Sequence, residues 1–121
     1  MAKLIKIPLI NDDRGSLAVV EKISNFDIKR VYYIFNTNGK KRGGHRHKKT
    51  DQILICLNGS CNVFCVDEAK RETKYKLNRP DKGLLIEKED WHFMDDFTKD
   101  CLLLVLASEY FDKGDYITDA Y

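Results

Sequence analysis

Two histidines in the segment Arg42-Gly-Gly-His-Arg-His-Lys48 are the residues with the clearest chemical potential. Alternate residues of a strand point to the same side, so His45 and His47 are expected to aim together and Arg46 to aim away. The chain's third histidine is His92. Imidazole can move protons near neutral pH and can also bind metal ions. The segment therefore indicates an acid/base site, a metal site or, from its arginines and lysines, an anion-binding site.

The positive charge of the chain is local. Residues 40–49 contain six of the 21 basic residues and no acids, whereas the whole chain has a net charge of only +2. Nucleic-acid-binding domains are more often basic over an entire face. This distribution favours one small anion, such as a phosphate group, or a solvated loop, and we expect no nucleic-acid partner.

The spacing of the histidines with later residues separates the metal and the acid/base alternatives. Gly44-His45-x-His47 is followed by Gln52 and Gly59, and later by His92, a pattern that resembles the two-part signature of the cupin superfamily. In that superfamily two histidines, a glutamate and a later histidine usually bind a divalent metal. A neutral glutamine is a weaker ligand than a carboxylate, so we expect no metal, and imidazoles that are free to move protons.

Four further residues are candidates for substrate contacts. Arg42 could bind an anion or a carbonyl group, and Arg14, in the turn Asp12-Asp13-Arg14-Gly15, could bind a phosphate through two hydrogen bonds. Tyr32 shares a strand face with Arg30 and is expected in the pocket. Trp91 could stack on a base or a sugar, although an ordinary place in the core is equally compatible with the sequence.

The elements that must position these residues are short strands. Apolar and β-branched runs with turn signals between them recur along the chain, and Asn58-Gly59 is a strong hairpin signal. About ten strands at this spacing indicate an antiparallel sandwich or barrel. The expected strands cover residues 4–10, 16–21, 30–35, 43–47, 51–57, 61–67, 73–77, 83–87, 91–95 and 101–107, with partial helix expected only within 108–121.

Composition places the chain among small globular domains. At 121 residues, with 43% hydrophobic and 33% charged residues, one domain covering residues 1–121 is expected. The longest apolar run, residues 102–107, is far shorter than the ~20 residues that a membrane helix requires. No signal peptide is visible, so the four cysteines are expected to be buried free thiols in a cytoplasmic protein.

With these residues assembled, the chain resembles the nucleotide-sugar 3,4-ketoisomerases, the WxcM-like or FdtA-like family of cupins. The resemblance extends over nearly the whole chain. Its segments occur in the family's order: Arg14-Gly-Ser-Leu17, Ile28-Lys-Arg-Val-Tyr-Tyr-Ile34, Arg42-Gly-Gly-His-Arg-His-Lys48, Gln52-Ile-Leu-Ile-Cys-Leu-Asn-Gly-Ser60, Leu104-Val-Leu-Ala-Ser-Glu-Tyr110 and Asp115-Tyr-Ile117.

The resemblance implies an all-β cupin, a double-stranded β-helix or jelly roll, that is homodimeric and needs no cofactor. It implies a dTDP-4-keto-6-deoxyglucose substrate and a 3-keto product that an aminotransferase converts to a 3-amino sugar for surface polysaccharide. The family's His-x-His pair falls on His45 and His47, with the proton-transfer role most often assigned to the first, and the family's active-site tyrosine and arginine fall on Tyr32 and Arg42.

The resemblance also bears on the configuration of the product at C4. One group of members has arginine in the Arg-Gly turn and histidine after the tryptophan, as Arg14 and His92 stand here, and that group forms the galacto product. The chain departs from the family pattern around His45 and ends at Tyr121, where many members continue as a helix.

Two other enzyme classes remain open at this point. One is a metal-dependent cupin, such as a dioxygenase, that uses His45, His47, Gln52 and His92. The other is a sugar-nucleotide 3,5-epimerase, which uses a histidine base near a tyrosine on a similar barrel. A non-catalytic module that binds nucleic acid through the basic loop ranks last, because no nucleic-acid-binding motif accompanies the loop.

Overall fold

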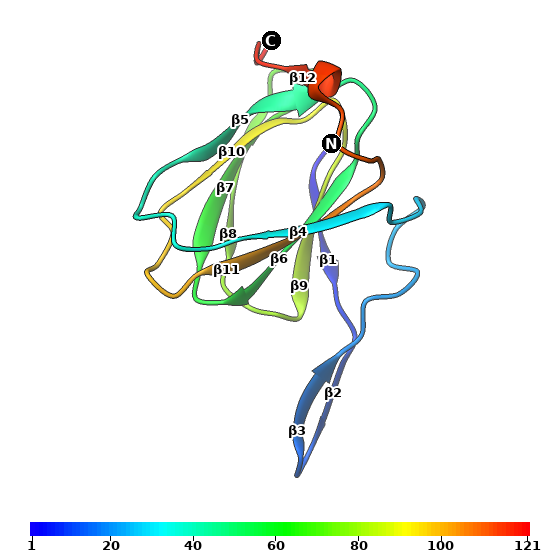
Figure 1. Cartoon of the computed structure of the whole chain (residues 1–121), viewed down its shortest axis with the longest axis vertical. Coiled ribbons are helices and arrows are strands. Elements are labelled where there is room, and N and C mark those ends of the chain that lie inside the picture. Colours follow the sequence, from blue (N-terminus) through cyan, green and yellow to red (C-terminus); the bar gives the residue numbers. More distant parts are fainter.

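A computed structural model describes all residues from Met1 to Tyr121 (Figure 1). Strands dominate it, and one short 3₁₀ helix, η1, lies near the C-terminus. The elements are β1 (Lys3–Lys6), β2 (Leu9–Asp12), β3 (Gly15–Ala18), β4 (Arg30–Ile34), β5 (Arg42–His47), β6 (Gln52–Asn58), β7 (Cys61–Val66), β8 (Glu72–Leu77), β9 (Lys82–Ile86), β10 (Trp91–Asp95), β11 (Leu102–Ala107), η1 (Lys113–Asp115) and β12 (Tyr116–Ile117).

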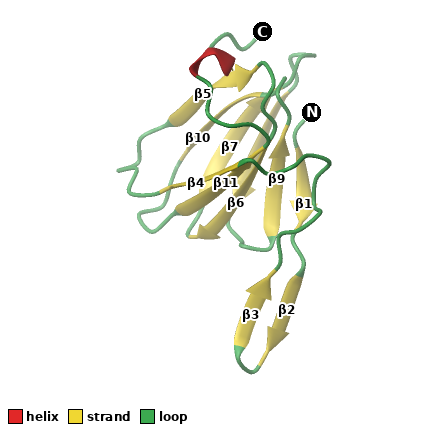
Figure 2. Cartoon of the chain, turned by 45° about the vertical axis from the view of Figure 1, so that its right-hand side comes forward, coloured by secondary structure: helices red, strands yellow, loops and turns green.

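Two five-stranded antiparallel sheets form the body of the molecule (Figure 2). The first sheet has the order β1-β9-β6-β11-β4, and the second has the order β12-β5-β10-β7-β8. Strands that are neighbours in a sheet are mostly distant in sequence, as in a jelly roll. The antiparallel sandwich or barrel expected from the strand pattern and the cupin fold implied by the resemblance are therefore confirmed.

The main core lies between the two sheets. Alternate residues of each strand point inward, so β6 contributes Leu54 and Cys56, and β7 contributes Cys61 and Val63. Each of these four side chains is at most 1% exposed. A second apolar cluster on the outer face of the first sheet contains Ile7, Ile53, Ile55 and Leu106.

The N-terminal segment differs from expectation because a proline interrupts it. The alternating run Leu4–Ile10 was expected as one strand, but β1 ends at Lys6 and β2 begins at Leu9. Pro8 lacks an N–H group and cannot continue the hydrogen-bonded ladder. The chain leaves the first sheet there, and β2 and β3 form a separate hairpin that projects from the barrel (Figure 1).

The C-terminal segment contains little helix. Only Lys113–Asp115 is helical, in a single 3₁₀ turn, and Tyr116–Ile117 then pairs with β5 as β12. Asp112 begins the turn by accepting a hydrogen bond from the Gly114 N–H at 3.0 Å. None of the helical segments has the length and apolar character needed to cross a bilayer.

Candidate active site

A pocket of about 300 Å³ opens where β4, β5 and β10 meet the C-terminal segment. Its lining combines imidazole, guanidinium and aromatic groups, which is the mixture expected of a polar-ligand site. The lining residues are Arg30, Tyr32, Ile34, Arg42, Gly43, His45, His92, Met94, Phe111 and Tyr116. Four of the residues predicted from sequence, Tyr32, Arg42, His45 and His92, thus meet in one place.

A glycine in β5 sets how closely β5 and β10 approach each other. A Cβ atom on Gly43 would lie 3.0 Å from the carbonyl oxygen of His92, and the φ of Gly43 is +93°. Only glycine adopts that conformation at low cost. The ladder has a bulge immediately after His92, and its register places His92 opposite His45. This local geometry brings the two imidazoles together at the pocket.

His45 is partly buried and lines the pocket. Loss of water around the ring, reinforced by the neighbouring His47, lowers the pKa of His45 to about 4. The imidazole is therefore neutral at pH 7 and can accept a proton. Arg46 points the other way, as strand parity predicted, and donates from Nε to the Asp119 carbonyl at 2.9 Å.

His47 lies behind His45 and does not line the pocket. The two ring centroids are 5.0 Å apart, in an edge-to-face arrangement. Nδ1 of His47 lies 2.9 Å from Oδ2 of the buried Asp115 carboxylate, whereas Nε2 is buried without a partner. A carboxylate favours a proton on Nδ1, which leaves the lone pair on Nε2.

Asp115 is held in place by several donors. The backbone N–H groups of Lys48 and Lys49 reach its Oδ1 at 3.2 and 2.8 Å, and the Thr50 hydroxyl donates to its Oδ2. Burial acts to raise the pKa of Asp115, but the hydrogen bonds from Thr50 and His47 outweigh it and hold the pKa below its ordinary value. Asp115 is therefore an anion that orients His47.

His92 completes the group of rings. Its centroid lies 5.3 Å from that of His45 and 6.2 Å from that of His47. Full burial lowers its pKa to about 3, so this imidazole is also neutral at pH 7. Its Nδ1 lies 3.2 Å from the Asp90 carbonyl oxygen, which leaves Nε2 to face the other rings or a ligand.

Tyr32 and Gln52 form a hydrogen-bonded pair at the edge of the pocket. The Gln52 amide donates from Nε2 to the Tyr32 hydroxyl at 2.9 Å. Burial raises the pKa of Tyr32, so its hydroxyl stays protonated at neutral pH. Because the phenol oxygen already accepts from Gln52, its own proton is free to point into the pocket. Gln52 is 2% exposed and reaches the pocket only through Tyr32.

Two guanidinium groups supply positive charge. Arg42 lines the pocket near its mouth, and Arg30 lies 5.3 Å above the Tyr32 ring and 5.7 Å from that of Phe111. The buried Nε of Arg30 has no hydrogen-bond partner. An unpaired buried donor is costly, so a polar ligand that accepts from Arg30 would offset that cost.

The remaining predicted residues lie outside this pocket. Arg14 is at the tip of the β2–β3 hairpin, where its exposed guanidinium pairs with Asp12 at 2.7 Å. Trp91 neighbours His92 in β10 and therefore faces the opposite side of the sheet. Its indole donates to the Thr118 carbonyl at 3.0 Å and packs edge-on against Phe93.

Sequence reasoning did not select four residues that help to form the site: Arg30, Phe111, Asp115 and Tyr116. The Tyr116 ring lies 4.7 Å from His45 and 4.9 Å from His47. Strand parity already placed Arg30 on the face of Tyr32. Asp115 and Tyr116 lie some 70 positions from the histidine pair, and only the pairing of β12 with β5 brings them there.

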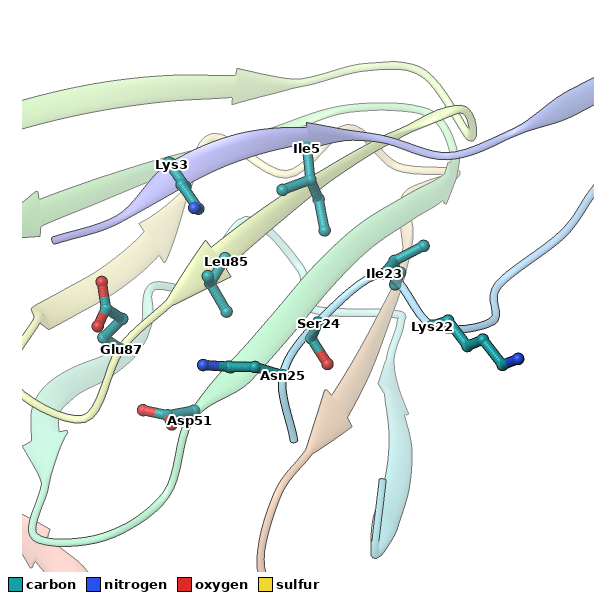
Figure 3. Close-up of a pocket in the computed structure, with 9 residues that line it drawn as sticks. All are labelled: Lys3, Ile5, Lys22, Ile23, Ser24, Asn25, Asp51, Leu85 and Glu87. Atoms are coloured by element: carbon teal, nitrogen blue, oxygen red, sulfur yellow. The ribbon is translucent and has the colours of Figure 1, made fainter. Parts of the chain in front are cut away.

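The largest hollow of the molecule, about 440 Å³, lies elsewhere (Figure 3). It is on the outer side of the first sheet, between β1 and the segment that precedes β4. Its polar residues are of mixed charge: Lys3 and Lys22 with Asp51 and Glu87. It contains no histidine, no tyrosine and no arginine, so it lacks the combination of imidazole, phenol and guanidinium groups that lines the histidine pocket.

Comparisons with known proteins identify relatives of this chain. The profile of a family described as "FdtA: WxcM-like, C-terminal" matches residues 1–121. A curated protein of Aneurinibacillus thermoaerophilus, a TDP-4-oxo-6-deoxy-alpha-D-glucose-3,4-oxoisomerase, is 48% identical over 118 residues, which cover 95% of this chain and 84% of the relative.

Solved structures show the same likeness. The 3,4-ketoisomerase QdtA of Thermoanaerobacterium thermosaccharolyticum, in complex with TDP, has a TM-score of 0.92 and 46% identity, over 98% of this chain and 88% of that one. A double variant of QdtA, Tyr→Arg and Arg→His, has the same TM-score and 48% identity, over 98% and 87% of the two chains. A Bacillus anthracis dTDP-4-dehydrorhamnose 3,5-epimerase shares the fold, with a TM-score of 0.82 at 20% identity over 95% of this chain and 76% of that one.

Proposed function

The chain belongs to the FdtA, WxcM-like family of TDP-sugar 3,4-ketoisomerases, and we propose that it converts TDP-4-keto-6-deoxyglucose to the 3-keto isomer. The observation that carries the proposal is a neutral, partly buried His45 in a pocket that also holds a phenol and two guanidinium groups. Complexes of a homologue with TDP support the nucleotide part of the substrate.

The first step is removal of the C3 proton. That proton is acidic because the adjacent C4 carbonyl delocalises the charge that forms. His45 is the base, since it is neutral at pH 7 and lines the pocket, whereas His47 is shielded behind it. The proton moves to the His45 imidazole and the electron pair to the C4 oxygen, giving an enediolate.

The second step moves the carbonyl. The Tyr32 hydroxyl, with its proton free, and the cations of Arg30 and Arg42 stabilise the oxygen charge. The C3 hydroxyl loses its proton as the C4 oxygen gains one, and the His45 imidazolium, whose proton exchanges with solvent, gives a proton to C4. C3 then becomes the carbonyl, His45 is neutral again, and no redox cofactor takes part.

The second histidine acts through the first. Asp115 fixes the tautomer of His47, and His47 packs edge-on against His45. We assign His47 and Asp115 a positioning role: they hold the His45 ring in the orientation that faces the substrate.

The product configuration at C4 depends on which side of the enediol receives the proton. We propose the galacto product, from the pair Arg14 and His92. The QdtA variant that gains an arginine and a histidine is 48% identical to this chain, and unaltered QdtA is 46% identical. Two matched positions in a chain of 121 residues account for a difference of that size. This agreement supports the assignment of the chain to the group with Arg and His at these positions.

Arg14 can contribute to such a site only from a second copy of the chain, because its hairpin projects away from the body (Figure 1). β4 is the edge of the first sheet, and its outward residues Val31, Tyr33 and Phe35 are each more than half exposed. Ile10 and Leu17 form an equally exposed pair on the hairpin. We propose a homodimer in which each hairpin covers β4 of the other copy, next to its pocket.

Mixed dimers test the shared site. Arg14→Ala and His45→Asn chains should each be weakly active alone, and co-expression should restore activity, because the first chain's pocket then receives an intact hairpin. Activity that stays at the sum of the two separate variants would contradict the shared site. Sedimentation of the wild-type protein should give the mass of two chains.

The reaction itself is tested by NMR. The protein is incubated with TDP-4-keto-6-deoxyglucose, a TDP-sugar 3-aminotransferase and its amino donor, and the amino sugar is identified with its C4 configuration. Carrying the reaction out in deuterium oxide with a chelator present tests for label at C4 and for independence from metal ions. Absence of a 3-amino product would refute the proposed activity, and label at C5 would instead indicate a 3,5-epimerase. A 3-amino-3,6-dideoxy sugar made in this way suits incorporation into surface polysaccharide.

A further inference from the structure

Three of the four cysteines form a cluster that the proposed reaction does not use. The Sγ atoms of Cys56, Cys61 and Cys101 all lie within 4.8 Å of one another, and those of Cys56 and Cys101 are 3.7 Å apart. The three residues are 1%, 1% and 4% exposed. No disulfide joins them. Three convergent sulfur atoms in one buried place form a ligand set for a thiophilic ion.

The cluster lies at the far end of the barrel from the histidines. Cys56 follows Gln52 by four residues on the inward face of β6, so it lies about 13 Å further along the strand. Cys56 lies in β6 of the first sheet, Cys101 immediately precedes β11 of the same sheet, and Cys61 begins β7 of the second. An ion bound by all three would join the two sheets at this end.

The turn beside the cluster packs closely against a neighbouring segment. Gly59 has a φ of +68°, and a Cβ there would overlap Thr98 Oγ1 and lie 2.9 Å from Cys101 Cα. The β6–β7 turn therefore packs directly on the segment that leads to Cys101. The carbonyl oxygens of Asn58 and Gly59 accept from Cys56 Sγ at 3.2 and 3.5 Å.

We propose that Cys56, Cys61 and Cys101 form a binding site for a divalent thiophilic d¹⁰ ion, Zn²⁺, which ties the two sheets together. Binding replaces three S–H protons with three sulfur–metal bonds and releases the protons to solvent. A divalent ion fits better than Cu⁺, because it leaves one net negative charge in the buried site and not two. The Asn58 carbonyl or a water molecule would complete four-coordination.

Cadmium provides the test, since its bonds to thiolate give an ultraviolet charge-transfer absorption that bonds to histidine do not. Reduced, chelator-treated full-length protein is titrated with Cd²⁺. The expected result is a thiolate band that saturates at one ion per chain. No band at several equivalents of Cd²⁺ would overturn the proposal.

Matched variants locate the site. Cys61→Ala and Cys101→Ala should each lose most of the band, whereas Cys65→Ala should keep it, because Cys65 is an equally buried cysteine of β7 outside the cluster. Circular dichroism of each variant confirms the fold. A full band in both cluster variants would also overturn the proposal.

Thermal melts give a second measurement that does not require any variant to fold. Zn²⁺ at about a hundredfold its Kd should raise the Tm of the wild-type protein by on the order of 10 °C. An unchanged Tm in the wild-type protein at saturating Zn²⁺ would contradict an ion that ties the sheets.

Discussion

At one end of the barrel β6 places Gln52 beside the histidine pocket, and four residues further along the same inward face it places Cys56 in the sulfur cluster. The histidine end is open and keeps unpaired polar atoms, Arg30 Nε and His47 Nε2. The cysteine end is closed by the packed turn at Gly59. The difference teaches that one set of strands can carry a reactive end and a stabilising end. Substitutions at the first should mainly lower activity, and substitutions at the second should mainly lower stability.

The largest difference between the effect on activity and the effect on stability is expected from His45→Asn. Loss of the base should lower kcat by about 10²–10⁴-fold, the usual contribution of a positioned general base. Because His45 is only partly buried, the Tm should change by no more than a few degrees. Steady-state kinetics with the coupled aminotransferase, together with a thermal melt, checks both. Near-normal kcat would show that the base is another group.

Asp115→Asn should affect both activity and stability. The amide keeps the shape of the carboxylate, but its NH₂ group replaces one acceptor oxygen. That group faces the donors of Lys48, Lys49, Thr50 and His47, so at least one donor is left unpaired. We expect kcat to fall about 10–10²-fold with KM little changed. We also expect the free energy of unfolding to fall by about 1–3 kcal/mol.

A positioning role for Asp115 makes a further distinction possible. In the His47→Asn background, Asp115→Asn should lower kcat little further, because the two residues act as one unit. Full multiplication of the two losses would mean that Asp115 has an effect independent of His47.

Cys61→Ala should give the opposite outcome to His45→Asn. Removal of one buried sulfur atom should cost about 1 kcal/mol of unfolding free energy, and kcat should stay within about twofold of the wild type. Chemical denaturation in the presence of a chelator measures the first quantity without any contribution from bound metal. A tenfold fall in kcat would mean that the two ends are coupled.

The pH dependence of stability tests the histidine end alone. His45 and His92 have pKa values of about 4 and about 3 in the folded chain, below the ordinary 6.5. The unfolded chain therefore binds more protons between pH 6.5 and pH 4, and stability should fall as the pH is lowered through that window. Melts at pH 7, 6 and 5 should show a declining Tm, with a shallower decline in His45→Asn than in the wild type.

Much of the site could be predicted from sequence because strand parity is a local property. The two-residue period placed His45 and His47 on one side and Arg46 on the other, and it placed Tyr32 with Arg30. The strand pattern also predicted the barrel. The alternation of residues 4–10, however, conceals the break at Pro8, which follows directly from the missing N–H group of proline.

Long-range pairing is the part that sequence could not supply. The anion that orients His47 is Asp115, 68 positions away, and no local pattern distinguishes it from the other acids near the C-terminus. The spacing of Gln52 made it a candidate, but its hydrogen bond with the Tyr32 hydroxyl depends on the strand order, which places β6 and β4 on either side of β11. The sulfur cluster likewise depends on three strands meeting.

The β12–β5 pairing has a kinetic consequence. Because His47 and Asp115 are 68 positions apart and β12 has only two residues, this contact closes a long loop with few bonds to hold it. Topologies rich in such distant contacts fold slowly, and weakly held segments dock late. On dilution from denaturant, enzymatic activity should therefore return after the bulk of the β-sheet circular dichroism signal, so that catalysis itself reports completion of folding.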